Sequence, residues 1–239
     1  MSWRPPPPDS RRCNIGVIDA ANATDLSAYY SEPLLIRGGA RTWPAQQRWS
    51  FAWLLREWGD LAVALAPGIG DTTVRAYLDE LRQQPTEPPA NLTASPQFVF
   101  QPLSWDWLGT RGRLQWSDVE ADVRLPAFLA QWGRGAADLR ELGNWFLSVG
   151  PSGSGQHFHS HGEAFNAVVA GRKRWFFLPP GSAVEAGEYA SSLEFARRLP
   201  AEGVMECTQD TGDVVVVPAQ VPHAVINVGD TVSVSLDRV

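Results

Sequence analysis

The histidines are the residues of this chain whose type and spacing best suit chemistry. There are four, and three of them, His157, His159 and His161, alternate with other residues, while His223 lies far along the chain. Side chains two apart in a strand point to one face, so the three clustered imidazoles, with Glu163 beyond them, are expected to project together. Neutral imidazole is a common metal ligand. The pattern therefore predicts a metal site.

Strand geometry limits how the clustered histidines share a metal. Same-face neighbours lie about 6–7 Å apart, so two of the three can bind one ion, but three in a row cannot easily do so. Spacing alone allows His157 with His159 or His159 with His161. A third ligand must come from another strand, and His223 is the only histidine left to supply it. We expect Glu163 at the rim or in solvent, with an outer-ligand or acid/base role as the alternative.

Lysine is even scarcer than histidine in this sequence. Lys173 is the only lysine, and all the other basic residues are arginines. A lysine is a compact point charge on a flexible stem, and the planar fork of an arginine does not replace it. Lys173 is therefore a candidate for binding an anionic group, whereas the ordinary alternative is a solvated strand residue.

Length and composition narrow the class of protein. The 239 residues are 44% hydrophobic and 19% charged, which suits one sizeable core. The net charge of -6 argues against a nucleic-acid or anionic-lipid partner. No apolar run approaches the roughly 18 residues of a membrane-spanning helix. Partners are expected to be proteins, peptides or small molecules.

The chain divides by texture into a leader and one domain. Residues 1–12, with four consecutive prolines, predict a disordered leader. Residues 13–239 predict a single domain, in which 13–143 form a helical and strand-bearing elaboration and 144–239 a β-barrel core. Cys13 and Cys207 allow at most one disulfide, which would tie the N-terminal arm to the barrel, and free buried thiols are an equal alternative.

The spacing of hydrophobic residues predicts the helices and strands. Helical spacing predicts helices over Trp49 to Trp58, capped by Ser50, and over Thr73 to Gln84. Short apolar runs bounded by Gly and Pro predict strands at Pro33 to Arg37, Trp145 to Val149, Ala164 to Ala170, Arg174 to Leu178, Val214 to Val217, His223 to Val228 and Thr231 to Leu236. Such strands favour a sandwich or barrel over a parallel α/β sheet.

Several short motifs stand in one order along the second half of the chain. They are Gly153 with His159-Ser-His161, Gly171-Arg-Lys-Arg-Trp-Phe-Phe-Leu-Pro-Pro180, and Gly212-Asp213, Pro218 and Pro222-His223-Ala-Val-Ile-Asn227. This order and spacing resemble the JmjC (jumonji C) and cupin-like hydroxylases. Gln220 stands where the second cupin motif usually has Gly, and Asn166 lies roughly where the first has Glu. The resemblance covers the C-terminal half well and the rest more weakly.

The resemblance implies a fold and a reaction. The fold would be mainly β with flanking helices: a double-stranded β-helix, or jelly roll, of the cupin-like JmjC type. The protein would be an Fe(II)- and 2-oxoglutarate-dependent dioxygenase that hydroxylates a protein, peptide or small molecule. The metal ligands would be His159, His161 and His223, and the twelve-residue step from His159 to Gly171 favours this register over one that includes His157.

The resemblance also assigns the cosubstrate side of the site. Lys173 falls where many JmjC hydroxylases bind the distal carboxylate of 2-oxoglutarate. Gln156 stands where many of them have a Thr that contacts 2-oxoglutarate, and an amide can hydrogen-bond a carboxylate. Asn227 is the third candidate on this side, with a turn at the end of its strand as the alternative.

One departure from the family motif leaves two other functions as alternatives. The family usually has Asp or Glu at the second ligand position, where this chain has His161. Three neutral imidazoles keep the full charge of the ion and also suit Cu, Zn or Ni. The alternatives are a three-histidine cupin-type metalloenzyme that does not use 2-oxoglutarate, and a non-catalytic metal-binding scaffold that acts through protein interaction. The resemblance implies the secretory-pathway lumen, with the cytoplasm as the alternative.

Overall fold

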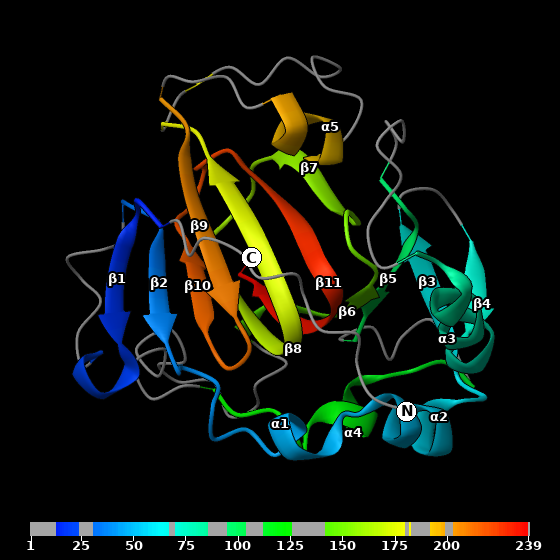
Figure 1. Ribbon diagram of the computed structural model, residues 1–239. Coiled ribbons are helices and arrows are strands. Elements are labelled where there is room, and N and C mark those ends of the chain that lie inside the picture. The colour runs from blue at the N-terminus through cyan, green and yellow to red at the C-terminus, as the bar shows by residue number, and fades with distance from the viewer. Residues whose placement is uncertain are drawn as a thin grey trace.

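A computed structural model of the chain is shown in Figure 1. It describes residues 13–23, 31–66, 70–85, 95–103, 112–125, 142–179, 182, 192–198 and 203–238. The predicted leader, residues 1–12, lies outside the described residues. Among the residues that are described, no helix is both long and apolar enough to cross a membrane.

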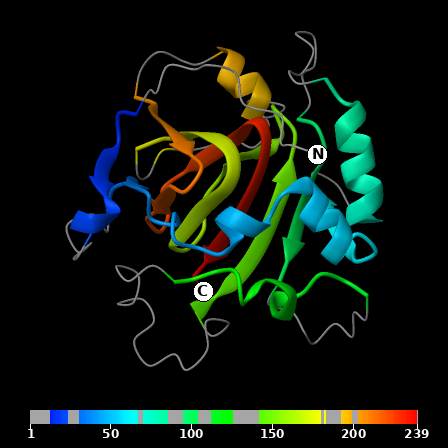
Figure 2. The same cartoon turned by 60° about the horizontal axis from the view of Figure 1, so that its bottom comes forward.

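Two long antiparallel strands, β8 (Ala164–Phe177) and β11 (His223–Asp237), form the spine of the barrel. The last part of β11, from Val232, pairs with residues 164–170 of β8, and its first part, residues 223–228, pairs with residues 172–177 of β8. The pairing shifts register between these two parts. Both strands curve strongly there (Figure 2), and each contributes to two layers of sheet.

The remaining strands extend the two layers. In the main layer the order is β1-β2-β10-β8-β11-β6-β5-β3-β4, while β9 pairs with β8 and β7 with β11 in the second layer. Their bounds are β1 Gly16–Asp19, β2 Leu34–Arg37, β3 Ala62–Ala66, β4 Asp71–Thr73, β5 Phe98–Pro102, β6 Asn144–Gly150, β7 Gly155–His159, β9 Met205–Asp210 and β10 Val214–Val217. This is the predicted jelly roll with flanking helices, so the predicted fold class is confirmed.

A glycine explains how one strand serves both layers. Gly171 has φ +84°, and a Cβ on it would lie 2.1 Å from the carbonyl oxygen of Asp230. Only glycine accepts that backbone conformation and that close approach. The sequence predicted one strand before Gly171 and a separate one after it, and likewise one strand before Gly229 and another after it. The structure corrects each pair to one continuous, bent strand.

Two amphipathic helices pack on one outer face of the sheet. Ser50 caps α2 (Phe51–Trp58) and Thr73 caps α3 (Val74–Gln83), and each hydroxyl accepts a backbone N–H of the first turn, at 3.3 and 3.2 Å. Their apolar faces meet β3, β5 and β6 at buried valines. Both helices are therefore confirmed to within two residues. The shorter helices are η1 Ala20–Asn22, α1 Ala45–Arg48, α4 Trp116–Val119 and α5 Ser192–Arg198.

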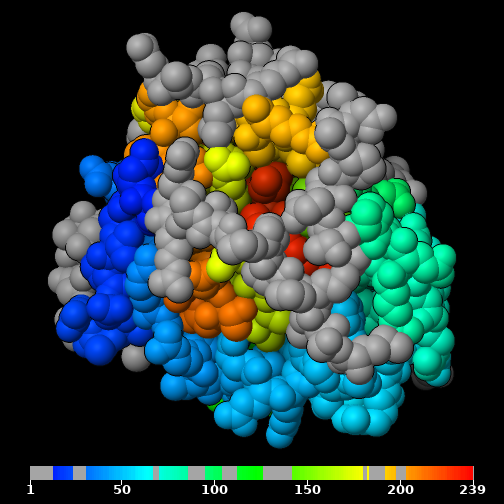
Figure 3. Space-filling model, viewed as in Figure 1, coloured from blue at the N-terminus to red at the C-terminus, as the bar shows by residue number. Residues whose placement is uncertain are grey.

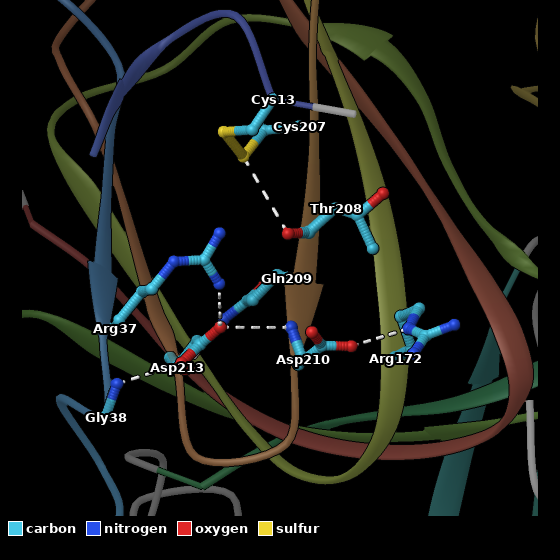
Figure 4. Close-up of polar contacts among 9 residues, drawn as sticks. All are labelled: Cys13, Arg37, Gly38, Arg172, Cys207, Thr208, Gln209, Asp210 and Asp213. Carbon is cyan, nitrogen blue, oxygen red and sulfur yellow. Dashed lines mark hydrogen bonds and ion pairs between the residues drawn. A yellow bond between two sulfur atoms is a disulfide. The ribbon is translucent and has the colours of Figure 1, made fainter. Parts of the chain in front are cut away.

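A disulfide ties the beginning of the described chain to the second layer. Cys13 and Cys207 are bonded, so the alternative of two free thiols is wrong. The Asn14 N–H donates to the carbonyl oxygen of Glu206 at 2.9 Å, and the two cysteines form an isolated antiparallel bridge. The bond therefore holds residues 13–14 against the outer edge of β9 (Figure 4).

Candidate metal centre

A cavity of about 340 Å³ lies between the two layers of the barrel. Aromatic and aliphatic side chains form much of its wall, including Phe98 and Phe100 of β5, Phe165 and Trp175 of β8, and Val217 of β10. Its polar side chains are Ser148, Gln156, His159, His161, Asn166, Lys173, His223, Ser235 and Asp237. In the space-filling view, atoms of β11, in red, reach the surface at the centre of the face below α5 (Figure 3).

Three histidines meet at one end of this cavity. His159 ends β7, His161 follows two residues later, and His223 begins β11, where it pairs directly with His159. The candidate ligand nitrogens of the three imidazoles all lie within 4.8 Å of one another. The ring centroids are 4.3 to 5.2 Å apart. One ion can therefore reach all three side chains.

The hydrogen bonds of the rings fix which nitrogen faces the cavity. The Nδ1 atoms of His159, His161 and His223 lie 2.6, 2.8 and 2.9 Å from the backbone carbonyl oxygens of His157, Gly162 and Val221 in turn. A carbonyl oxygen only accepts, so each Nδ1 carries a proton and each Nε2 of a neutral ring offers a lone pair. Metal-binding histidines are typically oriented in this way.

Burial favours the neutral state that a ligand needs. Burial lowers the pKa of His223 to about 3, assisted by the neighbouring charge of His159, and it also lowers the pKa of His159. An imidazole with a lowered pKa keeps its lone pair at neutral pH. The donor set therefore fits a divalent transition metal, with three nitrogen ligands and room in the cavity for further ligands.

A bulge in β7 decides which histidines enter the cavity. His223 of β11 is opposite His159, and Val225 is opposite Gln156, so two steps on β11 correspond to three on β7. The extra residue breaks the alternation of faces. Gln156 and His159 line the cavity, whereas His157 is exposed. The expectation that His157, His159 and His161 share one strand face is therefore wrong.

Gln220, in the loop between β10 and β11, holds the backbone of His161 through hydrogen bonds. The backbone N–H of Gln220 donates to the carbonyl oxygen of His161 at 2.8 Å, and its side-chain amide donates to the same oxygen at 3.3 Å. Gln220 has φ +60°, a left-handed conformation that costs a non-glycine residue about 1–2 kcal/mol. Gln220 thus adopts a conformation that favours glycine, and its amide adds a contact to His161.

Lys173 lies in the same cavity and has no acidic partner there. Its side chain is 4% exposed, and its Nζ donates to the Oδ1 of Asn227 at 2.9 Å. No carboxylate of the described residues forms an ion pair with Lys173. Burial lowers the pKa of this ammonium to about 7. The alternative of a solvated strand residue is therefore wrong, and the site offers a buried cation to an anionic ligand.

The two amides predicted on the cosubstrate side occupy different places. Gln156 lines the cavity. Asn227 is 1% exposed and lies behind the wall, where its Nδ2 donates to the hydroxyl of Ser154 at 2.8 Å while its Oδ1 accepts from Lys173. Asn227 therefore orients the ammonium and does not line the cavity itself. Glu163 forms an ion pair with Arg238 at 2.9 Å and is not part of the cavity wall.

Of the other polar groups in the wall, the sequence motifs pointed to Asn166 but left out Ser148 and Ser235. The Oδ1 of Asn166 is buried and has no hydrogen-bond partner among the described residues. Asp237, the last residue of β11, also lines the cavity. Burial raises the pKa of Asp237, and the charge of His161 opposes that shift. Asp237 lies beyond both motif windows, so the only signal was its position two residues after Ser235 in an alternating strand.

Comparisons with known proteins give one group of relatives. Arginine-specific demethylase JMJ22 of Arabidopsis thaliana is 24% identical over 249 aligned residues, which cover 94% of this chain and 46% of that protein. JmjC domain-containing protein 8 of Rattus norvegicus is 33% identical over 137 residues, or 54% of this chain and 47% of that protein. No family model matches the sequence.

A third relative carries a description of its reaction. The protein named 2-oxoglutarate and iron-dependent oxygenase JMJD4 of Homo sapiens is 25% identical over 228 residues, which cover 81% of this chain and 52% of that protein. The chain thus spans about half the length of the curated relatives it matches. All three relatives have JmjC-type names, in agreement with the resemblance found in the motifs.

Proposed function

Since this chain is a JmjC family member related to JmjC domain-containing protein 8, we propose that it is a metal-dependent oxygenase. In this proposal it uses Fe(II) and 2-oxoglutarate to hydroxylate a protein, peptide or small molecule. Residues 13–239 act as a single domain, in which 144–239 supply every proposed ligand and the earlier part contributes Phe98 and Phe100 to the cavity wall.

One observation carries the proposal: a three-imidazole cluster and an unpaired buried ammonium share one cavity. Such a cavity has a place for a cation and a place for an anion. A dicarboxylate that chelates the metal with one end and meets Lys173 with the other uses both places. The JMJD4 relative, which is named as a 2-oxoglutarate and iron-dependent oxygenase, supports the choice of Fe(II) and 2-oxoglutarate.

Each residue has a task in this reading. His159, His161 and His223 hold Fe(II) through their Nε2 atoms, and the carbonyl oxygens bonded to their Nδ1 atoms keep the rings oriented. Lys173 binds the distal carboxylate of 2-oxoglutarate, and Asn227 holds the ammonium in place. When bound, Fe(II) and 2-oxoglutarate supply the activation of O₂ that accompanies oxidative decarboxylation.

The apolar side chains of the wall exclude water from the cavity. Trp175 lines the cavity, and its indole N–H donates to Gln209 at 2.7 Å, which fixes the ring between Lys173 and His223. Gln156 lies beside His159 and offers an amide to a carboxylate. Exclusion of water by such side chains strengthens the attraction between Lys173 and a bound carboxylate.

The disulfide supports a location for the reaction. Disulfides form and persist in oxidising compartments and are rare in the cytosol. The Cys13–Cys207 bond therefore favours the secretory-pathway lumen over the cytoplasm.

Binding of 2-oxoglutarate by the Fe(II)-loaded protein under anaerobic conditions tests the proposal. We expect saturable binding that Lys173→Met weakens at least about tenfold, because a buried charge-assisted contact is lost. Arg172→Met is the matched control, since this neighbour lies on the opposite face of β8 and pairs with Asp210 at 2.6 Å. Its affinity should stay within about twofold of the wild type.

Turnover completes the test. With O₂ admitted and ascorbate supplied as the two-electron reductant in place of the substrate, the loaded protein should convert 2-oxoglutarate to succinate and CO₂, and Lys173→Met should lose this turnover. Metal binding with no measurable 2-oxoglutarate binding would overturn the oxygenase proposal and favour the three-histidine metalloenzyme or scaffold. Equal 2-oxoglutarate affinity in wild type and Lys173→Met would show that Lys173 is not the anchor.

A further inference from the structure

The cavity contains one carboxylate that the roles above leave unused. Asp237, at the end of β11, is the only acidic side chain in the cavity wall among the residues that the structure describes. It is half-buried, and none of the described residues donates a hydrogen bond to its carboxylate or forms an ion pair with it. A carboxylate withdrawn from water without a partner is costly, so its position calls for a cation.

The backbone sets Asp237 beside the histidine that follows β7. Asp237 pairs with Ala164, and the next residue, Arg238, donates its N–H to the carbonyl oxygen of Glu163 at 2.7 Å. The end of β11 therefore runs along residues 163–164, close to His161. The carboxyl of Asp237 and the ring of His161 interact electrostatically.

The other charged side chain of the cavity does not neutralise Asp237. Lys173 donates to Asn227 in the second layer, whereas Asp237 belongs to the main layer. Two opposite charges in one cavity thus have no ion-pair partner within the described ranges of the chain. Three neutral imidazoles leave the full double charge on a bound divalent cation, and a nearby carboxylate lowers the cost of holding that charge away from water.

We propose that Asp237 is a fourth metal-binding residue, which contacts the ion through a metal-bound water and supplies the negative charge that the three-histidine set lacks. This inference rests on the metal site of the proposed function. In this arrangement β11 provides both its first residue, His223, and its last, Asp237, to one ion. The strand reaches the site twice because it bends through both layers.

Cobalt(II) affinity measures the contribution of Asp237 without any turnover. Competition with a chromophoric chelator at fixed pH should show that Asp237→Asn, which keeps the shape and removes the charge, binds Co(II) about 10–100-fold more weakly than the wild type. The visible spectrum of bound Co(II) should change as well. Glu163→Gln is the matched control, because its carboxylate already pairs with Arg238, and it should bind within about twofold of the wild type.

The histidine variants separate this inference from the proposed function. If His159→Ala and His223→Ala lose Co(II) while Asp237→Asn binds it like the wild type, Asp237 is not part of the site and only this inference fails. If the histidine variants also bind like the wild type, the proposed metal centre itself fails. Asp237→Ser, whose folding is checked by circular dichroism alongside Asp237→Asn, gives a second uncharged variant, and either one that folds decides the outcome.

Discussion

Two polar regions include neighbouring residues of β8, Arg172 and Lys173, and they differ in whether their charged side chains form ion pairs. At the corner between β9 and β10, Asp213 accepts the N–H of Gly38 at 2.8 Å and lies 3.6 Å from Arg37, and Arg172 pairs with Asp210 (Figure 4). In the cavity, the next residue of β8, Lys173, has a neutral amide as its only partner among the residues that the structure describes. One region satisfies its charges within the chain, whereas the other does not.

The difference separates groups that build the fold from groups that await a ligand. Asp213 is 3% exposed, and its bonds to two turns join β2 to the corner between β9 and β10. Its pairing stabilises the folded chain. Lys173 is equally buried, but burial of an ammonium beside an amide destabilises the fold unless an anion binds. Unpaired buried charge thus marks the ligand site, and paired buried charge marks structure.

The largest expected effect removes a proposed ligand from the cavity. We predict that His223→Ala lowers Co(II) affinity by at least about 100-fold, since a direct ligand contributes more than the oriented groups behind it. Unfolding temperature without metal should change little, because the imidazole lines a cavity and makes one hydrogen bond with the described residues. Metal titration and thermal unfolding check both parts, and a large loss of stability with intact affinity would reverse the roles of the two regions.

The next effect belongs to the paired region. We predict that Asp213→Ala lowers the free energy of unfolding by about 2–4 kcal/mol, because the N–H groups of Gly38 and Asp210 and the guanidinium of Arg37 lose their acceptor. Co(II) affinity should stay within about twofold. Urea denaturation gives the free energy, and Asp60→Ala, an exposed carboxylate, is the control for loss of charge alone.

The smallest effect has the opposite sign and depends on pH. We predict that Lys173→Met, in the absence of ligand, raises the free energy of unfolding by about 1–2 kcal/mol at pH 7 or below. The pKa of Lys173 is 10.5 in the unfolded chain and about 7 in the folded one. Between these values the unfolded chain holds a proton that the folded chain has released, so wild-type stability rises with pH.

The variant lacks that rise of about 1.4 kcal/mol per pH unit, so the two proteins should converge as the pH increases above about 7, and the wild type should become the more stable of the two before pH 10.5. Below pH 7 both states of the wild type are protonated at Lys173, and the difference should be constant. Urea denaturation of both proteins across this range measures the convergence. A constant difference across the whole range would mean that the ammonium is charged in the folded protein and has a partner.

The sequence predicted the barrel half better than the first half. Alternating apolar runs located Val214 to Val217 to the residue, and helical spacing located α2 and α3. The strands β1, β3, β4, β5 and β9 were missed: β4 and β9 consist mostly of polar residues, and β1, β3 and β5 are runs of only four or five residues. The continuity of β8 was missed because Gly171 reads as a break, whereas in the fold it makes a bend.

Sequence motifs predicted the central residues of the candidate site, but they did not predict the positions of His157 and Asp237, where the strands are irregular or curved. Histidine spacing left two registers open, and the resemblance to JmjC motifs selected the three residues that the fold brings together, although their role as ligands stays a prediction. The exposure of His157 follows from a bulge, which sequence alternation does not reveal. Asp237 enters the cavity only because β11 curves back across it. Long-range curvature of this kind depends on contacts between distant strands and leaves no local pattern.

The Cys13–Cys207 bond joins residues 194 positions apart, so it closes most of the chain into a ring. Closing a ring of that size removes conformational freedom from the unfolded chain and shifts the balance towards the folded state. Cys207 lies opposite Trp175 in the pairing of β9 with β8, so the wall of the cavity is braced by a covalent link whose presence is set by the thiol chemistry of the surroundings. A thiol reductant added to protect ferrous iron would therefore also loosen the barrel that holds it.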